Sequence, residues 1–209
     1  MNNKTIIYIT VIIVVILVVT GYFLWNNQKS PAEEINQEEG TGQENQEEKT
    51  EPEEIELIVF AKDEFEMKTP SAWQELTPPE GIKVMLTYLS EEQIDPEKEK
   101  SGFRTYLAIT FDDREGKSSE EFIQYVKEIL TDALPFIEFT KEESVIINGR
   151  TANVIEALVS QEGYNFKTLL VIINGEGEDV WTLSFNTSEV RWEDSKDLFY
   201  QIANSFKLK

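Results

Sequence analysis

The first 29 residues differ from the rest of the chain in their pattern of apolar and polar positions. From Thr5 to Trp25 there is no charged residue, and nearly every side chain is apolar. As a helix this run would be about 31 Å long, close to the roughly 30 Å hydrocarbon thickness of a bilayer. The pattern predicts a transmembrane anchor over residues 1–29, with residues 5–25 inside the membrane.

A cleaved signal peptide is the alternative for this segment, because it also begins with a positive charge, here Lys4, followed by an apolar run. Its apolar region is about 7–15 residues long and ends at a small-x-small site, whereas this run continues through Trp25 without one. We therefore expect retention, and cleavage would instead release a soluble secreted domain. The N-terminal amine and Lys4 outnumber Lys29 across the membrane, which predicts a single-pass protein with a cytoplasmic N-terminus and an extracytoplasmic C-terminal domain.

Residues 30–54 are polar, with Ile35 as their single large apolar side chain. Eleven Glu and one Lys between residues 30 and 56 give this stretch a net charge of -10. Such a segment cannot bury enough apolar surface to offset the entropy lost on ordering, so the composition predicts a disordered, self-repelling linker. A low-affinity site for cations or a basic partner is the alternative to a plain spacer.

From residue 55 to residue 209 the spacing of the apolar positions changes repeatedly and outlines one domain. Alternating apolar residues predict strands, and apolar residues three and four apart predict helices. The predicted strands cover 57–59, 65–67, 82–88, 105–111, 145–147, 150–159, 164–173 and 180–185. The predicted helices cover 122–133 and 188–206.

Local signals fix several of the turns and ends. Ser118 and Glu121 have the spacing of a capping box in front of the first helix. Asn148 and Gly149 predict a two-residue type I′ hairpin turn, because both tolerate a positive φ. Trp73 falls in a proline-bracketed stretch that we expect to be a loop. The order of elements predicts an α+β fold, an antiparallel β-sheet of about six to seven strands covered by helices.

Five short motifs recur in an order that resembles a known family. They are Phe65-x-Met67-x-x-Pro70-x-x-Trp73, Gly116-Lys117-Ser118-Ser119-Glu120-Glu121-Phe122, Asn148-Gly149-Arg150-Thr151-Ala152, Trp181-Thr182-Leu183 and Ser205-Phe206-Lys207. Over residues 57–209 they resemble the PsbP-like fold family, which includes an extrinsic protein of photosystem II, bacterial surface lipoproteins and a small nuclear Ran-binding protein. The resemblance implies an α/β/α sandwich and a noncatalytic interaction role.

No functional residue carries over from that family. The metal-binding histidines associated with the photosystem protein have no counterpart, because the chain contains no His. The lipoproteins anchor through a cysteine that is also missing here, and the predicted transmembrane helix would replace it.

Charge and composition narrow the chemistry further. A formal net charge of -21 repels nucleic acid, so we expect no nucleic-acid partner. Without His or Cys the chain lacks the usual zinc ligands, Cys nucleophiles and His general bases. We therefore predict no catalytic, metal or cofactor-binding residue and no cofactor.

Several residues could nevertheless form a site, and each has a simpler structural interpretation. Two acidic turns could bind Ca²⁺ through their oxygens, although neither has the spacing of an ordered Ca²⁺ loop. Trp73, Trp181, Trp192 and Tyr164 could line a ligand groove, but aromatic residues at these spacings are more often core. The acidic turns contain Asp112, Asp113 and Glu115 in one case and Glu176, Glu178 and Asp179 in the other.

Two further candidates lie in predicted strands or at their ends. Glu156 interrupts an apolar strand and faces either solvent or, paired with Arg150 or Lys167, a buried polar site. Residues 186–188 match a glycosylation sequon, but Ser188 is more simply explained as a helix cap.

These observations predict a membrane-anchored, noncatalytic binding or assembly module of the cell envelope, with an unidentified protein partner. The alternative is a carboxylate-based envelope hydrolase acting on glycans, which would need two carboxylates close together in a cleft. We expect the working surface around the acidic loop 90–102, which is too polar for the core. We expect one core in residues 55–209, containing Trp73, Phe122, Trp181, Phe199 and Phe206.

Overall fold

The computed structural model describes residues 55–88, 104–134, 136–161 and 163–209. Three predicted features lie outside these residues: the membrane anchor 1–29, the acidic linker 30–54 and the acidic loop 90–102. Within the described part of the chain, no helix is long and apolar enough to cross a membrane.

The larger sheet has seven strands in the order β3-β4-β5-β9-β8-β7-β6, and every neighbouring pair is antiparallel. Branched and aromatic side chains fill its central strands, where both faces are covered. The strands are β3 (Trp73–Leu76), β4 (Val84–Tyr88), β5 (Tyr106–Asp113), β6 (Ile137–Ile147), β7 (Arg150–Gln161), β8 (Tyr164–Asn174) and β9 (Asp179–Ser188).

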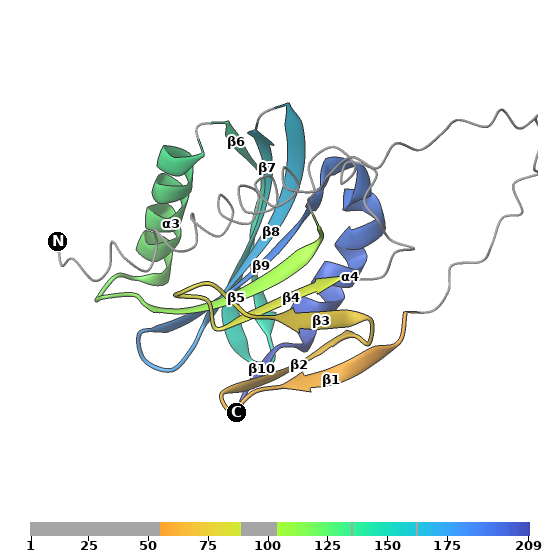
Figure 1. The fold of residues 1–209 in the computed structure, drawn as a ribbon. Coiled ribbons are helices and arrows are strands. Elements are labelled where there is room, and N and C mark those ends of the chain that lie inside the picture. Colours follow the sequence, from red (N-terminus) through yellow and green to blue (C-terminus); the bar gives the residue numbers. More distant parts are fainter. Residues whose placement is uncertain (1–54, 89–103, 135, 162) are drawn as a thin grey trace, which may run out of the picture.

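A second sheet of three short antiparallel strands lies beneath the larger one (Figure 1). Its strand order is β1-β2-β10, so the first and last strands of the domain flank the same central strand. The strands are β1 (Leu57–Ala61), β2 (Phe65–Pro70) and β10 (Lys207–Leu208).

Two α-helices complete the domain, α3 (Ser119–Ala133) and α4 (Trp192–Ser205). The predicted capping box at the start of α3 is present: Ser118 Oγ accepts a hydrogen bond from the Glu121 amide, and the Ser118 amide donates to Glu121 Oε2. A short 3₁₀ helix, η2 (Glu189–Arg191), precedes α4.

The helices cover opposite faces of the seven-stranded sheet, with the small sheet on the same side as α4 (Figure 1). Because successive strand residues point to opposite faces, the domain has two cores rather than one. Trp73, Trp181, Phe199 and Phe206 belong to the core beside α4, which we call the α4-side core. Phe122 belongs to the core beneath α3, the α3-side core, so the prediction of a single core is wrong.

The predicted α+β class, the antiparallel sheet and the Asn148–Gly149 turn are confirmed, and both turn residues have positive φ. Three boundaries differ. Trp73 begins a short strand instead of lying in a loop, and β6 begins at Ile137, well before residue 145. The last helix begins at Trp192, because residues 189–191 form the tighter 3₁₀ turn.

Candidate functional site

Glu156 lies in the middle of β7 on the face that points toward α4. Its exposed fraction is 6%, and it is the one charged residue in the described part of the chain that is buried. A buried carboxylate loses its hydration and needs charged or hydrogen-bonding partners in exchange. The surroundings of Glu156 are therefore a candidate functional site.

Tyr200 of α4 and Lys141 of β6 supply those partners. The Tyr200 hydroxyl donates a 2.8 Å hydrogen bond to Glu156 Oε1, and Lys141 Nζ lies 4.0 Å from the same oxygen. Lys141 Nζ also donates to the Tyr200 oxygen at 3.1 Å and to Glu143 Oε1 at 2.7 Å. Two strands, β6 and β7, and the helix α4 are thus linked through one carboxylate.

The buried polar site is confirmed at Glu156, but its predicted partners are wrong. Arg150 lies six residues away along β7 and pairs with Glu176 at 3.7 Å. Lys141 stands directly opposite Glu156 in the register of β6 and β7. Because the predicted strand began only at residue 145, the sequence pattern did not place Lys141 on it.

The protonation states of this network follow from burial and hydrogen bonding. Burial, above all, raises the pKa of the Tyr200 hydroxyl to about 12. The hydrogen bond to Glu143, followed by that to Tyr200, raises the pKa of the Lys141 ammonium. At neutral pH Tyr200 is therefore a neutral donor and Lys141 a cation.

An open groove of about 570 Å³ lies beside this network, between β6, β7 and β8 and the start of α4. A register shift between Phe139 and Lys141 bulges Thr140 out of the ladder, and its hydroxyl bonds the Glu156 carbonyl. The groove is lined by Thr140, Lys141, Glu156, Lys167, Glu189, Trp192, Glu193 and Lys196. Three ammonium groups and three carboxylates thus face one hollow, which suits a ligand bearing charges of both signs.

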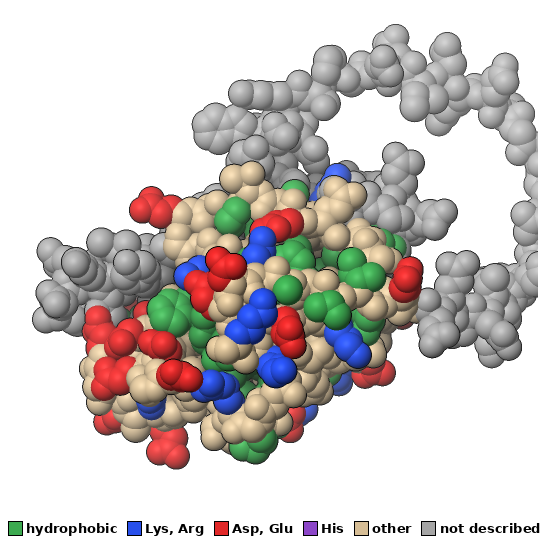
Figure 2. All heavy atoms as spheres, turned by 90° about the horizontal axis from the view of Figure 1, so that it is seen from below, with side chains coloured by type: hydrophobic (Ala, Val, Ile, Leu, Met, Phe, Trp, Pro, Cys, Tyr) green, Lys and Arg blue, Asp and Glu red, His purple; other side chains and the backbone are tan. Residues whose placement is uncertain are grey.

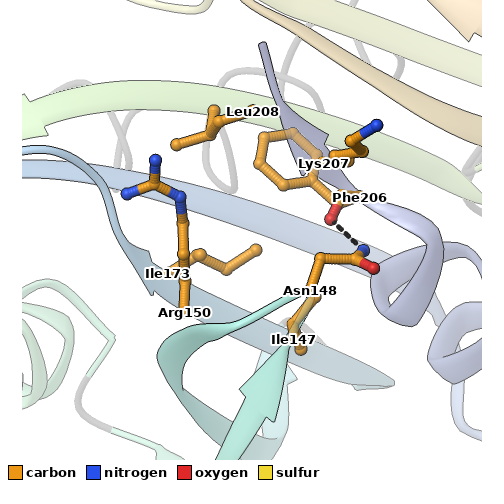
Figure 3. A pocket seen from close by; sticks show the side chains of 7 residues that line it. All are labelled: Ile147, Asn148, Arg150, Ile173, Phe206, Lys207 and Leu208. Atoms are coloured by element: carbon orange, nitrogen blue, oxygen red, sulfur yellow. Dashed lines mark hydrogen bonds between the residues drawn. The ribbon is translucent and has the colours of Figure 1, made fainter.

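A smaller hollow of about 300 Å³ lies where the β6–β7 turn meets the C-terminal strand. Figure 3 shows the Asn148 amide pointing at the Phe206 carbonyl, with Arg150 and Leu208 on the other side of the hollow. Asn148 Nδ2 donates to this carbonyl at 2.7 Å and to the Asn204 carbonyl at 3.1 Å. These bonds hold the chain end against the hairpin, so we interpret this hollow as structural.

The two acidic turns lie side by side, because Asp113 and Asp179 are opposite one another in the β5–β9 ladder. Their oxygens accept backbone amides: Glu178 Oε2 binds the Gly116 amide at 3.0 Å, and Asp113 Oδ1 binds the Glu115 amide at 2.6 Å. Nowhere in the described residues do three or more Asp or Glu side chains gather in a way that could hold a metal ion.

The aromatic candidates are structural. Trp73, Trp181 and Trp192 are all buried in the α4-side core. Tyr164 is half-buried and packs against the α3-side core, on the other face of the sheet. They do not form one ligand groove, although Trp192 also forms part of the wall beside Glu156.

The sequon is not available for glycosylation in the folded domain. Asn186 is 3% exposed, accepts a hydrogen bond from Thr168 and donates to Ser184. Ser188 occupies the N-cap position of η2 but makes no capping hydrogen bond through its side chain.

The sequence matches no protein-family model and none of the curated proteins. Solved structures do match the fold. The PsbP protein CyanoP of Synechocystis sp. PCC 6803 aligns with a TM-score of 0.55 and 18% identity, over 73% of this chain and 92% of CyanoP. The domain has the PsbP-like fold.

Two other PsbP-like structures illustrate how widely this fold is used. LpqN, involved in cell envelope biogenesis of Mycobacterium tuberculosis, aligns with a TM-score of 0.57 and 11% identity, over 74% of this chain and 91% of LpqN. The Ran-binding protein Mog1p of Saccharomyces cerevisiae aligns with a TM-score of 0.53 and 11% identity, over 74% of this chain and 96% of Mog1p. At these identities the similarity establishes the fold alone.

Proposed function

We propose that this protein is a noncatalytic, membrane-anchored binding or assembly module of the cell envelope. In this proposal residues 1–29 cross the membrane with the N-terminus in the cytoplasm. Residues 30–54 form an acidic linker, and the PsbP-like domain binds a protein partner on the outer side. The uncharged run of residues 5–25 and the envelope role of LpqN support this placement.

The groove beside Glu156 is the observation that carries the binding role. Glu156 Oε1 is taken by Tyr200, whereas Oε2 accepts no hydrogen bond from any described residue. A buried carboxylate held in place on one side and open on the other is prepared for a donor that arrives from outside. Lys167 and Lys196 on the groove wall add ammonium groups that would pair with carboxylates of the same partner.

The hydrolase alternative is less consistent with this geometry. A glycosidase needs two carboxylates facing each other across the scissile bond, one of them an acid. Of the three carboxylates that line the groove, only Glu156 is buried, and its neighbours are a phenol and an ammonium group, whereas Glu189 and Glu193 are exposed. Such a carboxylate is suited to binding a charged or hydrogen-bonding group.

Turnover assays separate these two functions. We expect the full-length protein to leave peptidoglycan, polysaccharides and peptides intact. Hydrolysis of any of them that is lost in Glu156→Gln but retained in Glu128→Gln, a change on the exposed face of α3, would contradict the proposal and favour the enzyme.

Protease accessibility tests on which side of the membrane the linker and the domain lie. In intact cells from which any outer barrier has been removed, added protease should digest residues 30–209 while a cytoplasmic control protein survives. Protection of the domain until the cells are lysed would contradict the proposed topology.

A further inference from the structure

β1 lies at the edge of the small sheet, and its outer side has no partner strand among the described residues. The strand reads LIVFA, with no charge, proline or bulge, and within the described residues it pairs with β2 alone. Two of its large apolar side chains are also exposed to solvent, Val59 at 66% and Ile58 at 45%. Figure 1 shows the strand at the margin of the domain.

The hydrogen-bonding phase of the β1–β2 hairpin decides which backbone groups point outward. The Ser71 amide donates to the Glu56 carbonyl, and the Lys62 amide donates to the Phe65 carbonyl. Both bonds continue the register of the β1–β2 ladder at its two ends. Even-numbered residues of β1 therefore bond to β2. Bonding alternates along an antiparallel strand, so the amides and carbonyls of Leu57, Val59 and Ala61 point away from β2.

The other sheet edges of the described domain carry the protection that β1 lacks. The β6 edge has a bulge at Thr140 and a run of charges in Lys141, Glu142 and Glu143. The β3 edge is four residues long and includes Glu75, and β10 is two residues long. Natural proteins block strand edges by these means, and an edge left open is suited to pairing with another strand.

We propose that β1 pairs with β1 of a second copy of this chain, antiparallel about a two-fold axis at Val59. In this register Leu57 faces Ala61 of the second copy. The outward amides and carbonyls of Leu57, Val59 and Ala61 then form up to about six backbone hydrogen bonds between the two copies. Ile58 faces Phe60, and Glu56 faces Lys62. The two small sheets become one continuous six-stranded sheet.

The match of charges and apolar residues selects this occupant and this register. A two-fold axis at Leu57 would set Glu56 against Ile58, and one at Ala61 would set Phe60 against Lys62. Only the axis at Val59 pairs apolar with apolar and Glu with Lys throughout residues 56–62. Lys62, which binds its own Glu75 at 2.7 Å, would then lie between two carboxylates.

The surrounding surface also permits two copies to approach. Lys207 pairs with Glu66 and Lys83 with Glu64, so acidic and basic side chains are mixed on this side of a strongly acidic protein. Figure 2, which views the molecule from below, shows this mixture of colours. These local ion pairs lower the repulsion that the net charge of -21 imposes at the contact.

Cysteine crosslinking of the full-length protein in its membrane tests this proposal, since the chain has no native cysteine. Val59→Cys should form a disulfide-linked homodimer under mild oxidation, because residues on the axis have Cα atoms about 5.5 Å apart. Ile146→Cys is the matched control: it is an equally exposed apolar residue on the protected edge β6, and it should not crosslink.

A mixed pair of variants tests the register. Glu56→Cys and Lys62→Cys, coexpressed with different tags, should crosslink to each other, while either variant alone should not, because its two copies would lie roughly 20 Å apart. Val59→Lys, which places like charges on the axis, should abolish dimer formation, and Ile146→Lys should leave it intact. Absence of the Val59→Cys dimer, equal crosslinking at all positions, or a mixed disulfide with a different protein would overturn the proposal.

Discussion

Glu156 shows what a single residue in a strand pattern can and cannot reveal. Its position in an apolar strand identified it as exceptional, and the structure confirms that it is buried. Its partners depend on strand register and on the helix that crosses above, which periodicity alone does not specify. Lys141 and Tyr200 lie 15 and 44 residues away, respectively, and could not be assigned from spacing.

Removing the Tyr200 hydroxyl tests the energetic value of this network. Tyr200→Phe should lower the free energy of unfolding by about 1–3 kcal/mol, because Glu156 Oε1 loses its donor while remaining buried. Urea denaturation of the full-length protein in detergent measures the change. Tyr125→Phe, a half-buried tyrosine on α3, is the control and should have a much smaller effect, and equal losses in both variants would contradict the assignment.

The raised pKa of Tyr200 predicts a loss of stability at alkaline pH. Because the folded-state pKa of about 12 exceeds the ordinary 10.0, folding favours the neutral phenol. This stabilisation is fully present below pH 10 and decreases as the pH rises toward 12. The unfolding free energy should decrease less steeply with pH in Tyr200→Phe than in the unmodified protein. Parallel curves of unfolding free energy against pH for the two proteins would contradict this prediction. Burial also raises the pKa of Tyr106, but Tyr106 is present in both proteins and affects both curves alike.

At the scale of elements, the β6–β7 turn both reverses the chain and fastens its end. Asn148 has φ of 48° and donates hydrogen bonds to the Asn204 and Phe206 carbonyls at the C-terminal end of α4. Asn-Gly predicted the turn from sequence, since both residues accept positive φ. The second role could not be predicted, because it depends on where the last helix ends in space.

Two substitutions separate these roles of Asn148. Asn148→Gly keeps the turn and loses the two hydrogen bonds, which should cost about 1–2 kcal/mol of unfolding free energy. Asn148→Ala loses the same bonds and, unlike glycine, keeps a Cβ at positive φ without the polar side chain that helps asparagine tolerate it, so it should cost roughly 1 kcal/mol more than Asn148→Gly. Thermal or urea unfolding measures both, and an alanine variant as stable as the glycine variant would contradict this division.

Strand and helix periods predicted most elements but missed those without a clear period. Five of the eleven residues of β6 are exposed polar or charged side chains that hide its alternation, so only its apolar end was visible. The four residues of β3 are too short for a pattern and lie between prolines that indicate a loop. Both are edge strands, which need fewer apolar residues because one side faces solvent.

At the scale of the whole molecule, the sheet divides two cores that should contribute independently to stability. Phe206, in contact with Phe65 and Trp181, belongs to the α4-side core, and Phe122 belongs to the α3-side core. Each change to alanine should cost about 3–5 kcal/mol by leaving a cavity. Because the sites share no partners, the double variant should lose nearly the sum, and a strongly non-additive result would argue for one coupled core.

The layered fold was predictable from the order of strands and helices and from the motifs resembling the PsbP-like family. The groove was not, because it forms only where the β6 bulge, the middle of β7 and the first turn of α4 meet. The residues that line the groove come from separate strands and helices, and no motif in the sequence joins them. The proposed recognition of an envelope protein through this groove therefore depends on residues that meet only in the folded domain.

Photocrosslinking from the groove in intact cells tests that claim most directly. A benzophenone amino acid at Lys196 in the full-length chain should give a discrete adduct with one envelope protein. The adduct should be strongly reduced by Glu156→Gln and by Lys167→Glu, while the same probe at Glu128 on α3 should not form it. The same adducts from both positions, or an adduct unaffected by either substitution in the groove, would contradict the account.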